Sequence, residues 1–278
     1  MLDGSAPIVL VRGGRDALDP AQVGKKFARL EQMRRASMCV PDLFCIPAAM
    51  FDAALAALPG CDFDDVHMRC AAMADGLRAL KFPPAWADPL LAAFDEQFGP
   101  DARVAVRACV VPTSTSDGKI DDAGEDGEHD PFAGMSDSYL YVTRDRLLDR
   151  IAACWASAFT ERSVQYRTWR GLDPARARVA VGIQRMVEAT RSFVAFTRDP
   201  RNGERCVVIA AAHGIGEGLV QEKADVDHFF VADGRVRAEV VHKEWMVDRE
   251  GRRASDALAV QPVPRELAEC PVLTDREA

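Results

Sequence analysis

Two basic side chains in this sequence of 278 residues stand where they could hold a phosphorylated ligand. Lys26 lies near the start of a helix expected over 23–33, and Arg107 lies in an alternating strand expected over 102–111. In such a strand Val104 and Val106 point to one side and Arg107 to the other. An inward-facing arginine in an apolar strand needs a partner, and a triphosphate needs cations and backbone N–H groups around it. By pattern alone, a lysine near a helix start, such as Lys26, is usually an ordinary solvated lysine.

The elements that would position these side chains divide the chain into two parts. Hydrophobic spacing, caps and breakers predict helices over 23–33, 47–58, 64–80, 85–98, 143–155 and 161–169. They predict strands over 8–11, 102–111, 178–187, 192–197, 206–211, 227–232 and 235–241, with turns at Asn202-Gly203 and Asp233-Gly234. The polar, acidic segment 113–131 is expected to be a solvated loop. We therefore expect an α+β fold with a helix-rich part at 1–186 and a strand-rich part at 187–278.

Composition narrows the possible partners. The formal net charge is −8 and the isoelectric point is near 5.2, which disfavours nucleic acid and anionic membranes as the main partner. The eight cysteines form no C-x-x-C pair, and no secretion signal or long apolar run is seen in the sequence. These features predict reduced thiols in a cytoplasmic protein. The acidic segment could hold Mg²⁺, although a simply solvated loop is the stronger reading.

Several short stretches occur in a fixed order along the chain. They are V-G-K-K-F-A-R-L at 23–30, V-P-D-L-F at 40–44, V-A-V-R at 104–107, F-A-G at 132–134 with Y-L-Y-V at 139–142, C-W-A-S-A-F-T at 154–160 with Y-R at 166–167, Q-R-M-V at 184–187, V-A-F-T-R-D-P at 194–200 and G-I-G-E-G-L-V-Q at 214–221. Together they resemble the nucleotide-binding domain of phosphoenolpyruvate synthase, pyruvate phosphate dikinase and rifampicin phosphotransferase. Any one stretch is weak, but the ordered set is specific.

The resemblance implies an ATP-grasp-like fold that holds ATP between two subdomains. It implies that Lys26 and Arg107 act as catalytic, phosphate-contacting cations. The ATP-binding residues that it implies are Lys26, Arg107, Gly134, Gln184, Met186, Val187 and Glu217. Gly134 would bring its loop close to the phosphates, the backbone of 184–187 would contact the adenine edge, and Glu217 would contact ribose or order the glycine loop. Without the resemblance, Met186 is a core residue and Gly134 a turn glycine.

The sequence departs from the family pattern at three places. The family pattern has serine and threonine directly after Arg107, but this sequence has Ala108-Cys109-Val110-Val111 there. Thr113, Ser114 or Thr115 would have to supply the missing hydroxyl groups. Lys25 and Phe27 replace two glycines beside Lys26. The family's magnesium carboxylates and its phosphohistidine motif have no counterpart, and none of His67, His129, His213, His228 and His242 lies in the motif's context. The metal ligands are therefore unknown, and Mg²⁺ is expected to be held with ligands from a partner.

These features lead to the hypothesis of a split enzyme. This chain would bind ATP, and a separate subunit would bring the phosphohistidine and the acceptor site. The family reaction converts ATP to AMP and phosphate and phosphorylates the histidine, which then passes phosphate to a small molecule such as pyruvate or a phenol; phenylphosphate synthase is a family example built from separate subunits. The alternatives are a degenerate, non-catalytic nucleotide-binding or scaffold subunit and an N-terminal fragment of a longer protein. A self-sufficient kinase fits least well.

Overall fold

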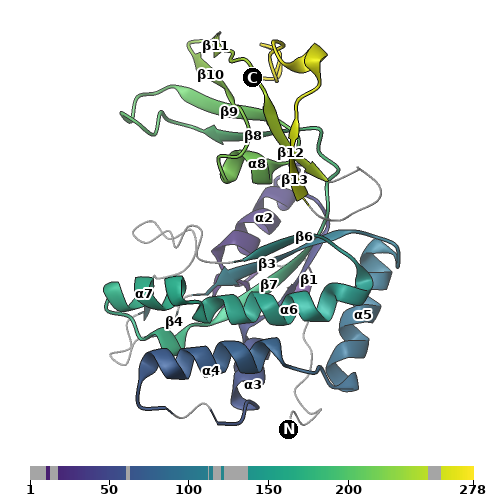
Figure 1. Cartoon of the computed structure of the whole chain (residues 1–278), viewed down its shortest axis with the longest axis vertical. Helices are drawn as coiled ribbons and strands as arrows, with labels where there is room; N and C mark the ends of the chain where they lie inside the picture. The colour runs from purple at the N-terminus through teal and green to yellow at the C-terminus, as the bar shows by residue number, and fades with distance from the viewer. Residues whose placement is uncertain are drawn as a thin grey trace. The chain divides into compact units, whose positions relative to one another are not determined.

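The computed structural model describes residues 18–60, 63–111, 137–249 and 258–278, together with the backbone of 11–12, 113–114 and 120–121. The chain divides into two compact units, Met1–Met186 and Val187–Ala278. Figure 1 shows the helices and strands of both units. Helices and strands alternate in the first unit and strands dominate the second, so the prediction of an α+β fold is confirmed.

The first unit is built on a five-stranded antiparallel sheet with the order β1-β2-β7-β3-β6. Its strands are β1 (Val11–Arg12), β2 (Leu43–Ile46), β3 (Val104–Val110), β6 (Ser138–Val142) and β7 (Val179–Arg185). β3 pairs with β7 along its whole length and with β6 on its other side. The strand predicted around Arg107 is therefore confirmed, and it is an inner strand of the sheet.

Seven α-helices are described in this unit, α1 (Pro20–Val23), α2 (Lys25–Arg35), α3 (Ala48–Ala56), α4 (Val66–Arg78), α5 (Pro84–Phe98), α6 (Leu147–Ala156) and α7 (Glu161–Trp169). Local signals explain their ends. The Asp65 carboxylate caps α4 by accepting from the Met68 N–H, the Thr160 hydroxyl caps α7 in the same way, and Gly99 ends α5 with a positive φ of 87°. Short 3₁₀ turns lie at Arg144–Arg146, Ser157–Phe159 and Pro174–Arg176.

The two faces of the sheet carry different cores. Alternate residues of β3 and β7, among them Val106 and Ile183, pack into a large cluster with Phe51 and Trp155 of α3 and α6. The opposite face packs against α1 and α2 through a smaller cluster that includes Phe27 and Cys109. Burial of the first face drives folding of the unit, because aromatic and aliphatic side chains supply most of its apolar area.

Two glycines allow α2 to lie close to the sheet. A methyl group on Gly182 of β7 would lie 2.2 Å from the Phe27 ring, so the ring occupies the space that any larger residue would fill. A methyl group on Gly24 would lie 2.3 Å from the Cys109 sulfur, and Gly24 also has a φ of 83°. The bulky Phe27, which departs from the family pattern, is thus accommodated by a glycine in the facing strand.

The second unit contains a four-stranded antiparallel sheet with the order β11-β10-β9-β8. Its strands are β8 (Arg191–Phe196), β9 (Val207–His213), β10 (Asp227–Ala232) and β11 (Arg235–Glu239). The tight turn predicted at Asp233-Gly234 is confirmed, since both residues have positive φ and Ala232 pairs with Arg235. Helix α8 (Gly216–Val220) follows β9, and β12 (Trp245–Arg249) pairs with β13 (Leu258–Pro262). A 3₁₀ turn at Arg265–Leu267 precedes the final segment.

One prediction about the loops needs correction. The segment 113–131 was expected to be a solvated loop, but β4 (Thr113–Ser114) pairs with β5 (Ile120–Asp121) inside it. Two β-branched residues, Thr113 and Ile120, favour this short pairing despite the acidic surroundings. The rest of the acidic segment and Gly134 lie outside the described residues. Among the described helices, none is long and apolar enough to cross a membrane.

Candidate functional site

Arg107 lies in β3 and faces the side of the sheet on which α1 and α2 pack. On this face it stands between Gly182 of β7 and Ser138 of β6, its partners in register. The Phe27 ring of α2 occupies the space over Gly182, and the neighbouring Ala105 has a small side chain, so Arg107 lies beside the part of this face that α2 covers. The side chain is half-buried, and no ion pair to another described residue neutralises its charge. A half-buried guanidinium without a carboxylate is suited to bind an anion.

Gln184 holds Arg107 in place. Its side chain is 9% exposed, and its Oε1 accepts a hydrogen bond of 3.2 Å from Arg107 Nη1. Two strands supply the pair, since Gln184 on β7 stands opposite Ala105 on β3, two residues before Arg107. The sequence predicted backbone contacts for Gln184, whereas the structure shows that its side chain orients the arginine.

Ser138 is a candidate that the sequence analysis missed. It is exposed and stands opposite Arg107 in the pairing of β6 with β3, so the hydroxyl and the guanidinium share one face. Hydroxyl donors were expected directly after Arg107, but Ala108, Cys109 and Val110 there are buried in the continuing strand. A serine therefore lies opposite the arginine on the neighbouring strand, although none follows Arg107 directly in the sequence. The sequence signal that could have identified Ser138 is its position between the F-A-G and Y-L-Y-V stretches at 132–134 and 139–142.

Lys26 reaches the same strand from α2. Its Nζ lies 3.4 Å from the Ala108 carbonyl oxygen, one residue beyond Arg107. The position of α2 is fixed by Phe27, the next residue, which packs on Gly182. The structure therefore brings Lys26, Arg107 and Gln184 to neighbouring positions.

The thiol of Cys154 lies beneath this end of the sheet. Its sulfur is 3.6 Å from the Val106 carbonyl oxygen and 3.7 Å from that of Asp137. Burial raises the pKa of the Cys154 thiol far above its ordinary value, with Asp137 adding to the rise and Lys26 opposing it. The thiol is thus a neutral donor that ties β3 to the start of β6, and it is not activated as a nucleophile.

Met186 and Val187 close the first unit and open the second. The Met186 N–H donates to the Arg103 carbonyl at 3.0 Å, and the Val187 carbonyl accepts from Ala189 at 2.9 Å. Among the described residues, no hydrogen bond occupies the Met186 carbonyl or the Val187 N–H. One acceptor and one donor therefore remain on adjacent residues, which is the pair that an adenine edge requires.

The two remaining predicted residues lie elsewhere. Glu217 is in the first turn of α8 in the second unit, where its carboxylate accepts from the Gln221 side chain. Gly134 lies outside the described residues. No group of three or more histidine, cysteine, aspartate or glutamate residues in the described part is arranged to hold a metal ion.

Comparison with known proteins identifies the class. The family described as pyruvate phosphate dikinase, AMP/ATP-binding domain, matches residues 20–278. The chain belongs to this family.

Three relatives show the range of similarity. The chain is 38% identical over 148 residues to rifampicin phosphotransferase from Bacillus subtilis, covering 52% of this chain and 16% of the relative. It is 31% identical to the prodigiosin synthesizing transferase PigC of Serratia marcescens, covering 87% and 26%. It is 29% identical to a probable phosphoenolpyruvate synthase of Pyrococcus abyssi, covering 78% and 26%. The matched part spans between 16% and 39% of the length of the curated relatives.

Proposed function

We propose that this chain binds ATP on the sheet face that carries Arg107, Gln184 and Ser138. The observation that carries the proposal is the half-buried Arg107, held by Gln184 and not neutralised by a carboxylate in the described part of the chain. Such a cation is stabilised by an anion, and phosphate oxygens accept from guanidinium in a well-defined geometry. Membership of the AMP/ATP-binding domain family supports the choice of nucleotide.

Each residue of this face has a part in binding. Arg107 and Ser138 donate hydrogen bonds to phosphate oxygens, and Lys26 adds positive charge at the neighbouring strand position. Gln184 positions Arg107, while the Met186 carbonyl and the Val187 N–H contact the adenine edge. Glu217 and Gly134 keep the roles that the resemblance implies. An ATP-grasp-like arrangement of subdomains 1–186 and 187–278 is part of this proposal.

We further propose that the chain is the nucleotide-binding component of a split phosphotransferase in the cytoplasm. A separate subunit supplies the histidine that is phosphorylated as ATP becomes AMP and phosphate, the ligands for Mg²⁺, and the site for a small acceptor such as pyruvate or a phenol. Magnesium, when bound, neutralises phosphate charge. The proposal rests on the AMP/ATP-binding domain family, whose model the chain matches over residues 20–278.

Calorimetric titration with ATP and with AMP tests the first proposal. We expect micromolar binding of ATP by the purified chain, weakened at least about tenfold in Arg107→Ala, since a charge-assisted hydrogen bond is lost. Arg176→Ala, an exposed arginine of the same unit, is the matched control and should leave affinity unchanged. Equal affinity of the wild type and Arg107→Ala would contradict the assignment of this face.

A degenerate scaffold subunit is the second candidate. It is favoured by the buried, apolar continuation of β3 after Arg107, which offers no hydroxyl to the phosphates. The two candidates differ in the release of AMP. With ATP, Mg²⁺ and the protein that co-purifies with the chain, the enzyme component yields AMP together with acid-labile phosphate on the partner, whereas the chain alone yields none. Binding of ATP without either product favours the scaffold.

A further inference from the structure

A buried histidine of the second unit has a ring nitrogen without a hydrogen-bond partner. His213 is the last residue of β9 and is 5% exposed, and its Nε2 atom bonds to no other described residue. Burial favours the neutral form of an imidazole, because it removes the water that would solvate the charged form. His213 has no part in the proposed nucleotide site.

The register of the sheet places His213 among charged side chains. Arg191 of β8 stands directly opposite His213, and Asp227 of β10 stands opposite Ala211, two residues before it. Because side chains two residues apart in a strand point to the same side, Arg191, His213 and Asp227 share one face of the sheet. Lys243 reaches this face through its ion pair of 3.0 Å with Asp227. The described charged groups that act on His213 are therefore two cations and one carboxylate.

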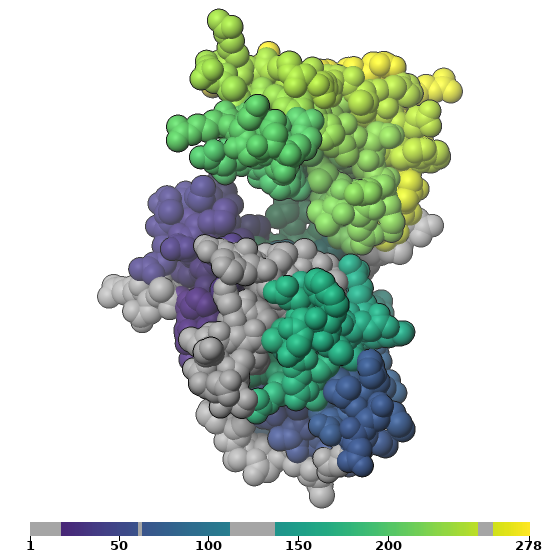
Figure 2. All heavy atoms as spheres, turned by 90° about the vertical axis from the view of Figure 1, so that its left-hand side faces the viewer, coloured from purple at the N-terminus to yellow at the C-terminus, as the bar shows by residue number. Residues whose placement is uncertain are grey.

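The last segment of the chain, residues 265–278, covers this face, and we call it the C-terminal strap. Figures 1 and 2 show the strap in yellow at the surface of the second unit. Val272 of the strap packs into the apolar cluster of the sheet. Its N–H donates to Asp227 Oδ2 at 2.8 Å, and its carbonyl accepts from Arg191 Nη1 at 3.0 Å. Two charged residues on the face of His213 thus hold the strap directly.

Protonation of His213 would add a third cation to this set, with Asp227 as the carboxylate between them. Burial, and then Lys243, lower the pKa of His213 below its ordinary 6.5. Asp227 and the Leu267 backbone act in the opposite direction, and Arg191 adds to the lowering. A protonated imidazole is therefore more stable in water than beneath the strap.

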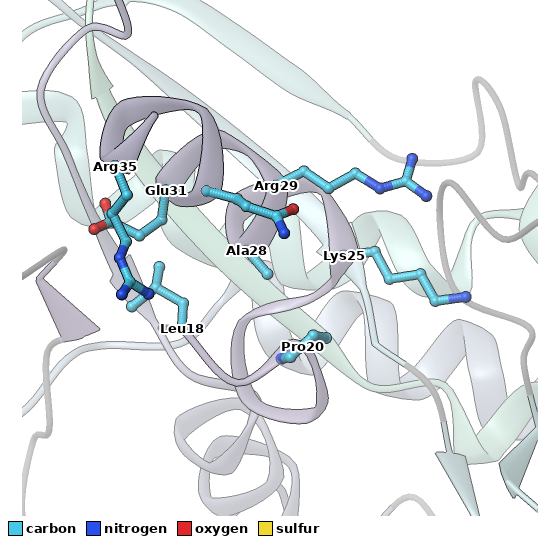
Figure 3. A pocket seen from close by; sticks show the side chains of 8 residues that line it. Leu18, Pro20, Lys25, Ala28, Arg29, Glu31 and Arg35 are labelled. Carbon is cyan, nitrogen blue, oxygen red and sulfur yellow. The ribbon is translucent and has the colours of Figure 1, made fainter. Parts of the chain in front are cut away.

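His213 differs in this respect from the exposed titratable groups of the chain. The other described histidines are exposed, and so are Arg29 and Arg35 of α2. Figure 3 shows these two arginines extending from the helix in different directions. An exposed group keeps its hydration whatever its charge, whereas the charge of a buried group changes the free energy of the elements packed on it.

We propose that His213 and the C-terminal strap form an acid-sensitive switch, in which the strap is closed over neutral His213 and opens when His213 is protonated. Opening exposes the apolar cluster of Ile209, Ala211 and Phe229 beneath the strap. Because the pKa of His213 is lower in the closed form, closing is fully favoured above pH 6.5 and weakens as pH falls below it. The switch lies within the second unit and does not depend on ATP binding.

Amide hydrogen exchange of the full chain, read by mass spectrometry, measures opening of the strap. After correction for the intrinsic pH dependence of exchange, we expect faster exchange of strap peptides as pH falls from 6.5 to about 5. The gain is up to about tenfold per pH unit, which is the limit for one proton. Glu277 of the strap does not contribute in this range, since its pKa is about 2. Peptides from β7 of the first unit should show no such change.

Substitutions assign the effect to one residue. His213→Gln and His213→Phe cannot take up a proton, so strap exchange in both should be independent of pH in this range. His228→Gln and His242→Gln change exposed histidines of the same unit, and these controls should keep the acceleration of the wild type. Thermal melting at neutral pH shows which variants are folded.

Two results would overturn the proposal. One is strap exchange in the wild type that stays constant between pH 6.5 and about 5. The other is an equal acceleration in the wild type and in a folded His213 variant, which would assign it to another group. If neither variant folds, NMR titration of the wild-type imidazole decides. A His213 midpoint that coincides with strap opening supports the switch, and a ring that titrates at its ordinary 6.5 beneath a closed strap contradicts it.

Discussion

Gln184 orients Arg107 through a hydrogen bond, and substitutions of Gln184 measure how much this hydrogen bond contributes to ATP affinity. Gln184→Ala removes the Oε1 acceptor, so the guanidinium samples more orientations before it meets a phosphate. We expect ATP affinity to fall by about three- to tenfold, less than in Arg107→Ala, and Gln184→Glu to lower it further, since a carboxylate would neutralise the arginine. Calorimetry gives the affinities. Full ATP affinity in both Gln184 variants would show that the hydrogen bond has no part in binding.

The contact between Gly182 and Phe27 gives a second residue-level prediction. Gly182→Ala places a methyl group where the Phe27 ring lies, and overpacking of this kind costs about 1–3 kcal/mol in the free energy of unfolding. Phe27→Leu in the same chain should recover part of the loss, because the smaller side chain leaves room. Denaturant unfolding measures both, with Gly216→Ala as control, since its nearest neighbour would be 3.8 Å away. A Gly182→Ala variant as stable as the wild type would contradict the packing.

The sequence predicted which way Arg107 points but not all of its neighbours. Alternation along one strand fixes the face of each residue, so Val106 and Arg107 were assigned to opposite sides correctly. Ser138 and the side chain of Gln184 reach Arg107 only through the register of three strands, which is set by tertiary packing. The hydrophobic pattern of one strand does not indicate which residues lie opposite each other on neighbouring strands.

At the scale of elements, a buried ion pair joins β10 to the segment between β11 and β12. Lys243 Nζ lies 3.0 Å from Asp227 Oδ1, and both side chains are fully buried. Asp227 also accepts from the Val241 and Val272 N–H groups. Lys243→Met leaves this carboxylate without its cation, so we expect a loss of about 3–5 kcal/mol in the free energy of unfolding.

This loss is measured by chemical denaturation of the protein, followed through a spectroscopic signal that reports on the second unit. Glu269→Gln, which breaks the exposed pair between His242 and Glu269, is the control and should cost less than about 1 kcal/mol. A similar, small effect of both changes would mean that the Lys243 pair does not hold these elements together.

The turn at Thr274–Glu277 responds to acid. Hydrogen bonds from Arg191, and then from Thr274, lower the pKa of Glu277 from its ordinary 4.5 to about 2. Because the pKa is depressed in the folded chain, the contact is complete above pH 4.5 and is lost as pH falls toward about 2. Carbon NMR of the carboxyl group follows the titration. Arg191→Gln should return the pKa toward 4.5, and a wild-type pKa already at 4.5 would contradict the contact.

Elements with strong local signals were predicted and short ones were missed. Helix α7 and strand β10 agree with their predicted ranges, because a cap or a turn marks their ends. β2 has four buried residues and no alternation, so periodicity cannot distinguish it from other apolar runs. β12 and β13 were also missed; β12 has three adjacent buried residues and therefore shows no alternation.

At the scale of the whole molecule, ligand binding should raise the free energy of unfolding. A ligand that binds only the folded state stabilises it by about 2.7 kcal/mol at a hundredfold excess over its dissociation constant. We expect ATP to raise the melting temperature of the wild type, seen by calorimetric scanning, and to leave that of Arg107→Ala nearly unchanged. A rise of equal size in both proteins would locate the nucleotide away from Arg107.

The central claim is that ATP lies on the sheet face around Arg107, and NMR can map the nucleotide directly. Amide shifts of the isotope-labelled chain would be followed as a non-hydrolysable ATP analogue is added. If ATP lies on this face, the largest changes occur at 105–108, 137–139 and 182–187, and residues 28, 29, 32 and 35 of α2 are unaffected. Changes confined to these four residues of α2, or to the second unit away from Val187, would contradict this position of the nucleotide.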